Sequence, residues 1–83
     1  MEVKIIKFIS GEEVIAKFED GKFKKLRMFQ LTNDGNAGLV PWLVLAPDAE
    51  IELDAVKYVT CIDAPMDVEK QYLKAVSNIQ LLG

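Results

Sequence analysis

The sequence contains no histidine, so it lacks the side chain that most often serves as a general base or a zinc ligand. Its single cysteine, Cys61, cannot form an intrachain disulfide and is interpreted as a small packed apolar residue. There is no Gly-rich phosphate-binding loop, no apolar run of about eighteen residues and no signal-peptide pattern. These absences disfavour histidine or thiol catalysis and nucleotide-binding folds, and they predict a cytosolic protein.

The chain is short and rich in apolar residues. It has 83 residues, of which 51% are apolar, and a domain of this size can bury only part of such a surface. A surplus of apolar side chains in a small domain is commonly covered at subunit contacts. We therefore expect one domain, residues 1–83, that forms homo-oligomers.

Alternation of apolar and polar residues predicts a small antiparallel β-sheet. Two strands are expected at residues 2–9 and 14–18, and Asp20-Gly21 then gives the strongest hairpin signal in the chain. A third strand is expected at residues 23–32, with a β-bulge near Lys24 because the alternation changes parity there. After a turn at residues 33–38, two further strands are predicted at 39–46 and 56–62. Pro41 is expected at a bend or a strand edge, since it has no N–H.

The end of the sequence predicts an amphipathic helix over residues 65–78, with Asp63 or Asp67 as its cap. Its apolar stripe consists of Val68, Tyr72, Ala75, Val76 and Ile79. The fold class is therefore mainly β: a small, strongly bent, five-stranded antiparallel barrel over residues 1–62, Sm-like, SH3-like or OB-like, followed by a C-terminal α-helix.

One basic run stands out against a net charge of −3, because residues 22–27 hold four cations and no anion. Such a run can neutralise phosphates, and an aromatic ring within it can stack on a base. A charged edge strand that resists aggregation has the same pattern and is the favoured interpretation for a single copy, whereas repetition of the run around a ring favours phosphate binding. The candidate nucleic-acid-binding residues are Lys22, Phe23, Lys24, Lys25 and Arg27.

An acidic run follows later in the chain, at Asp48, Glu50, Glu52 and Asp54. Four alternating carboxylates can hold calcium or magnesium, but no glycine lies where a calcium loop needs its sharp turn. A solvated acidic loop is therefore the favoured interpretation, and we predict no metal and no cofactor. The single tryptophan, Trp42, is typical of a core or of a subunit interface.

Residues 9–15 (ISGEEVI), residues 39–43 (LVPWL) and the helix that contains Tyr72 together resemble a known family. The chain is similar to small Sm-like (LSm) proteins of marine bacteriophage, or cyanophage, and ocean metagenomes. The resemblance implies a homo-oligomeric ring of roughly five to seven subunits, joined edge to edge through the fourth and fifth strands. The interface residues expected in such a ring are Trp42, Val44, Tyr58 and Val59.

The resemblance also implies a function. Sm-like rings bind RNA at the loops after strands two and four, which correspond here to residues 19–22 and about 46–55. The Sm motif Asp-x-aromatic-Met-Asn is replaced by Glu19-Asp20-Gly21-Lys22, and the Arg-Gly of the second motif is absent. We therefore expect a non-enzymatic ring that binds RNA or single-stranded DNA through the basic run, with little sequence preference, in the cytoplasm of an infected bacterial host.

Two alternatives remain. The chain can be a protein-interaction module that binds a host or phage protein through its C-terminal helix and the strand that carries Trp42; the net charge of −3 favours this interpretation. The other is a metal-dependent hydrolase that uses the acidic run. Salt separates the first two functions, because phosphate contacts weaken steeply with added salt and apolar contacts do not.

Overall fold

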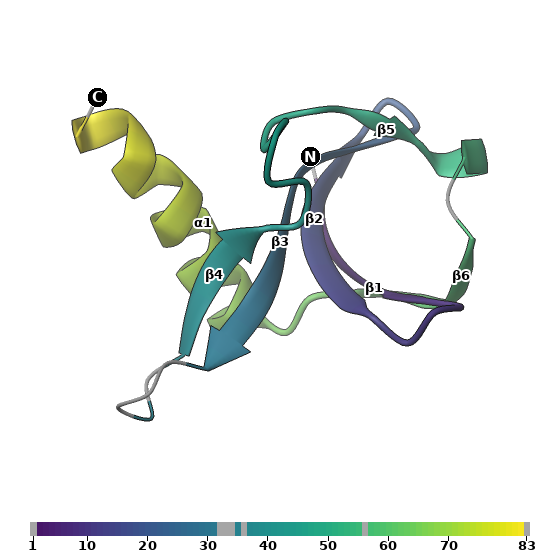
Figure 1. Cartoon of the computed structure of the whole chain (residues 1–83), viewed down its shortest axis with the longest axis horizontal. Coiled ribbons are helices and arrows are strands. Elements are labelled where there is room, and N and C mark those ends of the chain that lie inside the picture. The colour runs from purple at the N-terminus through teal and green to yellow at the C-terminus, as the bar shows by residue number, and fades with distance from the viewer. Residues whose placement is uncertain (1, 32–34, 36, 56, 83) are drawn as a thin grey trace.

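The computed structural model of the protein is a strongly curved antiparallel sheet followed by one long helix (Figure 1). It describes residues 2–31, 35, 37–55 and 57–82, without the side chains of residues 37, 55 and 78–82. The elements are β1 (Glu2–Phe8), β2 (Glu13–Glu19), β3 (Lys22–Leu31), β4 (Ala37–Pro41), β5 (Ile51–Glu52), the 3₁₀ turn η1 (Leu53–Ala55), β6 (Tyr58–Asp63) and α1 (Met66–Leu82).

The strands are ordered β4-β3-β2-β1-β6, and the short β5 pairs with the beginning of β3. The sheet bends so that β5 and β6 lie on the same side of it, opposite α1 (Figure 1). The mainly β antiparallel class with a C-terminal helix is confirmed. Closure into a five-stranded barrel is not: the described residues form six strands, and no ladder among them joins β5 to β6. β5 is only two residues long and pairs with β3.

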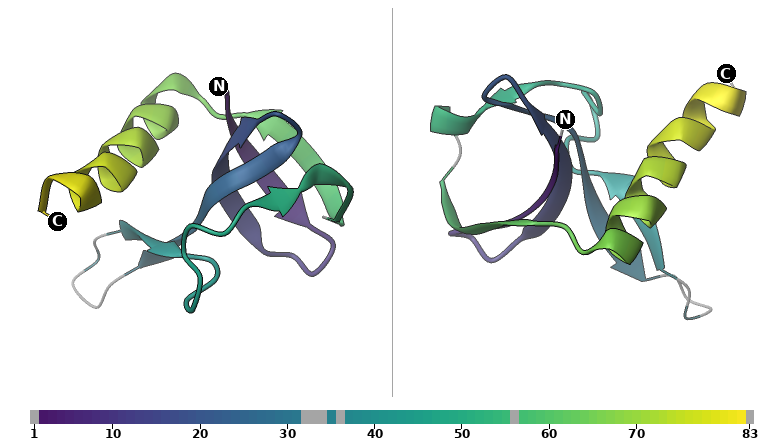
Figure 2. Two further views of the ribbon diagram at one scale, coloured as in Figure 1. Left: turned by 90° about the horizontal axis from the view of Figure 1, so that it is seen from above. Right: turned by 180° about the vertical axis from the view of Figure 1, so that it is seen from behind.

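The two faces of the sheet bury separate apolar clusters. The concave face holds the buried side chains Ile6, Phe8, Val14, Ala16, Phe23 and Leu26. On the convex face Val3 and Ile15 pack against Tyr72 and Val76 of α1, which crosses this side of the sheet (Figure 2). β1 and β2 therefore carry apolar residues on both faces because the helix covers the second one.

Two local predictions for the β2–β3 hairpin are confirmed. Asp20 and Gly21 both have positive φ, 55° and 76°, the conformation that a tight two-residue hairpin requires. The register then shifts by one residue between the pairs Lys17–Lys24 and Ile15–Arg27. Lys25, the residue with φ of 52°, lies in this bulge.

The hydroxyl group of Tyr72, on α1, forms hydrogen bonds with the backbone at this bulge. Tyr72, which is fully buried, accepts a hydrogen bond from the Lys17 amide at 3.1 Å and donates one to the Lys25 carbonyl at 2.8 Å. A bulge leaves backbone groups without ladder partners, and unpaired buried groups are costly. Tyr72 therefore ties α1 to the one irregular point of the β2–β3 ladder.

Several predicted boundaries were wrong. β4 ends at Pro41 and not at residue 46, because the chain turns out of the sheet: the Ala46 amide donates to the Leu43 carbonyl at 3.3 Å. β6 begins at Tyr58, and Val56, the predicted start, lies outside the described residues. Of the predicted turn at 33–38, residues 33, 34 and 36 lie outside the described residues, Gly35 has a positive φ of 85°, and residues 37 and 38 already belong to β4.

The helix is longer than predicted, since α1 spans Met66–Leu82. Its first turn is closed by the Glu69 amide on the Pro65 carbonyl at 2.8 Å, so Pro65 occupies the capping position expected for Asp63 or Asp67. The predicted stripe is confirmed at Val68, Tyr72 and Val76. In the part of the chain that is described, no helix is both long and apolar enough to cross a membrane.

Candidate interaction surface

The lysines of the basic run each lie beside a carboxylate. Lys22 Nζ is 3.8 Å from Glu50, and Lys25 Nζ is 3.5 Å from Asp48. Lys24 Nζ donates a hydrogen bond to Glu19 at 3.3 Å, which raises the pKa of Lys24, and lies 3.8 Å from Glu50. The run is therefore largely neutralised within the molecule.

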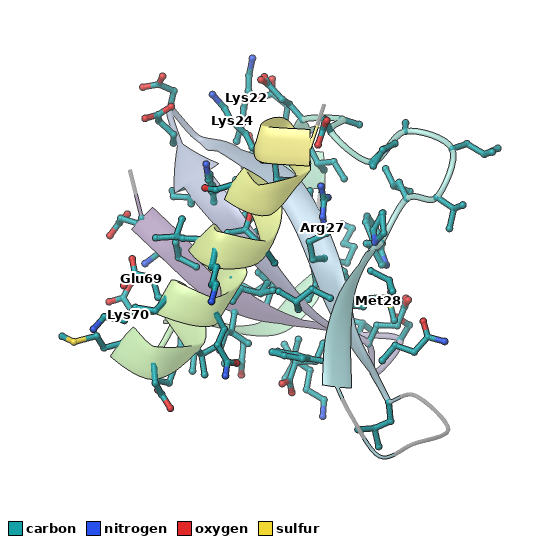
Figure 3. The ribbon with its side chains drawn as sticks, turned by 90° about the vertical axis from the view of Figure 1, so that its left-hand side faces the viewer. Lys22, Lys24, Arg27, Met28, Glu69 and Lys70 are labelled. Carbon is teal, nitrogen blue, oxygen red and sulfur yellow. The ribbon has the colours of Figure 1, made fainter. Side chains whose placement is uncertain are left out.

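Arg27 follows Lys22 and Lys24 along β3 (Figure 3), but unlike them it is buried. Its side chain is 5% exposed, and its guanidinium donates to the Leu26 carbonyl at 3.0 Å, the Pro47 carbonyl at 2.8 Å and Asp48 Oδ1 at 3.2 Å. The hydrogen bond from Arg27 holds the pKa of Asp48 below its usual value. Arg27 anchors the chain around Pro47 and Asp48, which corrects its predicted role as a phosphate ligand.

The predicted role of Phe23, whose ring was expected to stack on a base, is also wrong. Its side chain is fully buried in the concave core, where the ring lies 4.9 Å from that of Phe18. A base cannot stack on this ring. Strand alternation explains the position, since Phe23 points to the face opposite Lys22 and Lys24.

The acidic run provides the partners of the basic run. Asp48 pairs with Lys25 and Arg27, while Glu50 pairs with Lys22 and Lys24. Among the residues that the structure describes, no three potential metal ligands come together. The two charged runs, which lie apart in the sequence, are complementary segments brought together by β3 and β5. The opposite charge of the two runs is the signal that could have indicated this pairing.

β6 is an apolar strand with no buried residue. Tyr58, Val59 and Ile62 are 41%, 68% and 50% exposed. β6 pairs with β1 on one side only, and its other side has no partner among the described residues. Of the predicted interface residues, Tyr58 and Val59 lie on this open edge.

The backbone of β6 also has hydrogen-bonding groups that face outward. The Ala64 amide donates to the Val3 carbonyl at 3.0 Å, and the register pairs Ile5 with Ile62. Because groups in an antiparallel ladder alternate in direction, Ile62 faces β1 and Cys61 presents its backbone N–H and C=O to the open side. The strand can therefore accept a further strand by main-chain hydrogen bonds.

The other two predicted interface residues, Trp42 and Val44, do not belong to β6. Trp42 packs on Phe8 with ring centroids 5.0 Å apart, and its indole N–H donates to Glu12 at 3.1 Å. It belongs to the rim of the concave core and not to the open edge. Val44 is 78% exposed and lies in the loop that follows β4, beside Leu45.

Comparison with protein families and with curated proteins gives no match. No protein-family model matches this chain, and no curated protein sequence is significantly similar to it. Among the described residues β4 and β6 are the end strands of the sheet, and these edges, with the exposed apolar side chains, suit strand pairing and apolar contact with another protein chain.

Proposed function

We propose that this protein is a non-enzymatic protein-interaction module that self-associates through the open edges of its sheet. The observation that carries the proposal is β6, in which Tyr58, Val59 and Ile62 are all exposed and no residue is buried. Natural proteins protect open edges with charge, proline or a covering segment. On β6 the only charged residue is Asp63, at its last position, so a second chain is the cover that fits.

In a head-to-tail assembly, each copy contacts one neighbour through β4 and another through β6. β4 and β6 are the terminal strands of the path β4-β3-β2-β1-β6 and lie at opposite ends of the curved sheet (Figure 1). Pairing β4 of one copy with β6 of the next leaves one free edge at each end of the growing assembly. Closure into a ring removes these last edges. The Sm-like resemblance favours such a ring, of roughly five to seven subunits, in the cytoplasm of an infected bacterial host.

Binding of RNA or single-stranded DNA is the second candidate. It is supported by the three lysines of the basic run, whose side chains remain 42%, 28% and 27% exposed at Lys22, Lys24 and Lys25. Exposed ion pairs contribute only about 0–1 kcal/mol, so phosphates can compete with the carboxylates that hold these amines. A ring would repeat the lysines as a band. Phe23 and Arg27, being buried, take no part in this version.

The two candidates are separated by oligonucleotide binding at two salt concentrations. Fluorescence anisotropy with labelled oligo-U, oligo-A and oligo-dT is measured after light scattering has fixed the mass of the assembly. We expect an oligomer whose mass is insensitive to salt and which binds none of the three probes. A monomer at all concentrations tested would contradict the proposed self-association.

A matched pair of variants identifies any binding that does occur. Lys24→Ala/Lys25→Ala removes two cations of the basic run, and Lys70→Ala/Lys74→Ala removes two cations from the exposed face of α1. Salt-sensitive binding that the first variant loses and the second keeps would establish the nucleic-acid function. Binding that both variants lose equally would indicate only nonspecific attraction.

A further inference from the structure

The loop between β4 and β5 projects an apolar tip from the body of the molecule (Figure 2). Within residues 43–45, here called the 43–45 tip, Leu43 is 37% exposed, Val44 78% and Leu45 98%. Single apolar residues on a surface are ordinary, whereas a run of them marks a contact. The tip therefore has the apolar composition of a buried segment, although it is exposed to solvent.

The tip is held in a fixed position from its base. The Ala46 amide donates to the Leu43 carbonyl at 3.3 Å, and the Ala49 amide donates to the Ala46 carbonyl at 3.1 Å. Arg27, in the sheet, donates to the Pro47 carbonyl at 2.8 Å and to Asp48 at 3.2 Å.

Arg27 is 4% exposed, and a buried cation is tolerated only where its N–H groups find acceptors. Two of its acceptors belong to this loop, so the loop and the buried charge depend on each other. An apolar protrusion fixed in this way loses little conformational freedom when it binds.

We propose that the 43–45 tip of one copy packs against the exposed face of β6 in a second copy. This inference rests on the proposed self-association and deepens it by naming the contact. The tip supplies Leu43, Val44 and Leu45, and β6 supplies Tyr58 and Val59.

A second copy is the occupant favoured by the connectivity of the chain. The tip begins two residues after Pro41, the last residue of β4, and β4 is one open edge of the sheet. Antiparallel pairing of this edge with β6 of a neighbour carries the residues that follow Pro41 toward the Tyr58 end of that neighbour's exposed apolar strand. The same chain thus carries both halves of the contact at opposite ends of one sheet.

Charge near the tip disfavours a lipid surface. Segments that bind anionic membranes combine apolar residues with free lysine or arginine. In the described part of the chain, the cations beside this loop are each paired with one of its carboxylates: Lys25 and Arg27 with Asp48, and Lys22 and Lys24 with Glu50. The tip therefore has apolar character without the free positive charge that anchors a peripheral membrane protein.

A photocross-linking experiment tests the contact directly. The variant Leu45→p-benzoylphenylalanine is prepared with and without ¹⁵N label, the two forms are mixed and irradiated, and the tryptic peptides are identified by mass spectrometry. We expect mixed-isotope cross-links from position 45 to the peptide that begins at Tyr58. Leu31→p-benzoylphenylalanine is the control, because Leu31 is 77% exposed but lies at the far end of the β3–β4 ladder.

The outcomes separate the contact of the 43–45 tip from the proposed self-association on which it rests. Cross-links that fall outside residues 58–62, or only within one copy, would overturn the tip contact and leave self-association intact if the mass is oligomeric. A monomeric mass would overturn both. Cross-links to added phosphatidylserine vesicles in place of β6 would overturn the contact and assign the tip to a membrane.

Deletion of the apolar groups gives an independent measurement. Val44→Ser/Leu45→Ser should weaken self-association roughly a hundred-fold, because two largely exposed side chains would no longer be buried at the contact. Leu31→Ser should leave the dissociation constant unchanged. Equal dissociation constants for the tip variant and the unmodified protein would contradict the inference.

Discussion

β1 and β6 are neighbours in the sheet and have similar strand-forming sequences, yet their surroundings are opposite. β1 (EVKIIKF) buries Val3, Ile6 and Phe8, whereas β6 (YVTCID) buries no residue. β1 lies between β2 and β6 and has an apolar cluster on each face. Among the described residues β6 has one neighbouring strand, and only its Cys61 packs against the concave core.

This difference shows that strand propensity and burial are separate properties. β-branched and aromatic residues predict that a segment is extended, but the position of the strand in the sheet decides what covers it. When an edge strand has the apolar composition of a central strand, its side chains remain exposed because no neighbouring element covers them. In this protein we therefore propose that β6 is a subunit contact.

The largest difference is expected between matched truncations in the two strands. Ile6→Ala removes a fully buried side chain and should lower the free energy of unfolding by about 2–5 kcal/mol. Val59→Ala, on the exposed edge, should change it by less than about 0.5 kcal/mol. Urea unfolding of dilute, monomeric protein measures both. Similar losses for the two variants would show that β6 is covered within the monomer.

A smaller effect is expected where α1 joins the sheet. Tyr72→Phe leaves the Lys17 amide and the Lys25 carbonyl without their hydroxyl partner, which should lower the free energy of unfolding by about 1–3 kcal/mol. Thermal and urea unfolding measure the loss, with Tyr58→Phe on the exposed edge as control. An unchanged stability would show that the bulge does not depend on the helix.

Tyr72 should also make the stability of the folded state depend on pH in the alkaline range. Burial raises the pKa of Tyr72 to about 12, above its ordinary value of about 10. The folded state thus holds its proton more tightly, so the stability contributed by this group is present below about pH 10 and falls as the pH rises to about 12. Tyr72→Phe should flatten this alkaline loss; an identical profile for both proteins would contradict it.

The smallest effect is expected at the base of the 43–45 tip. The pKa of Asp48 is lowered by the hydrogen bond from Arg27, so the stability it contributes is present above pH ~4 and is lost as the pH falls through the lowered pKa. Asp48→Asn should cost at most about 1 kcal/mol at neutral pH and should reduce the loss of melting temperature in acid. Asp54→Asn, in η1, is the control and should behave like the unmodified protein.

Local sequence signals predicted much of the fold. The Asp20-Gly21 turn, the bulge near Lys24 and the apolar stripe of α1 each depend on residues close together in the chain. Such patterns follow directly from backbone geometry and side-chain periodicity. The class of the fold could therefore be predicted from the amino-acid sequence alone.

The candidate site was less predictable because it depends on distant pairs. The basic run has the composition of a phosphate-binding segment, but Asp48 and Glu50 lie beside it in the folded chain. Phe23 is buried because it alternates with Lys22 and Lys24 along β3, and the composition of the charged segment hides that alternation. The contacts of Tyr72 with Lys17 and Lys25 join residues 55 and 47 positions apart and leave no local pattern.

The central claim, that β6 is a subunit contact, is tested most directly by sedimentation equilibrium of the unmodified protein and of Val59→Lys. A lysine on an open edge opposes strand pairing and leaves the fold of the monomer intact, because Val59 is 68% exposed. We predict an oligomer for the unmodified protein and a folded monomer for Val59→Lys. An unmodified protein that is monomeric throughout, or a Val59→Lys variant that keeps the full oligomeric mass, would contradict the account.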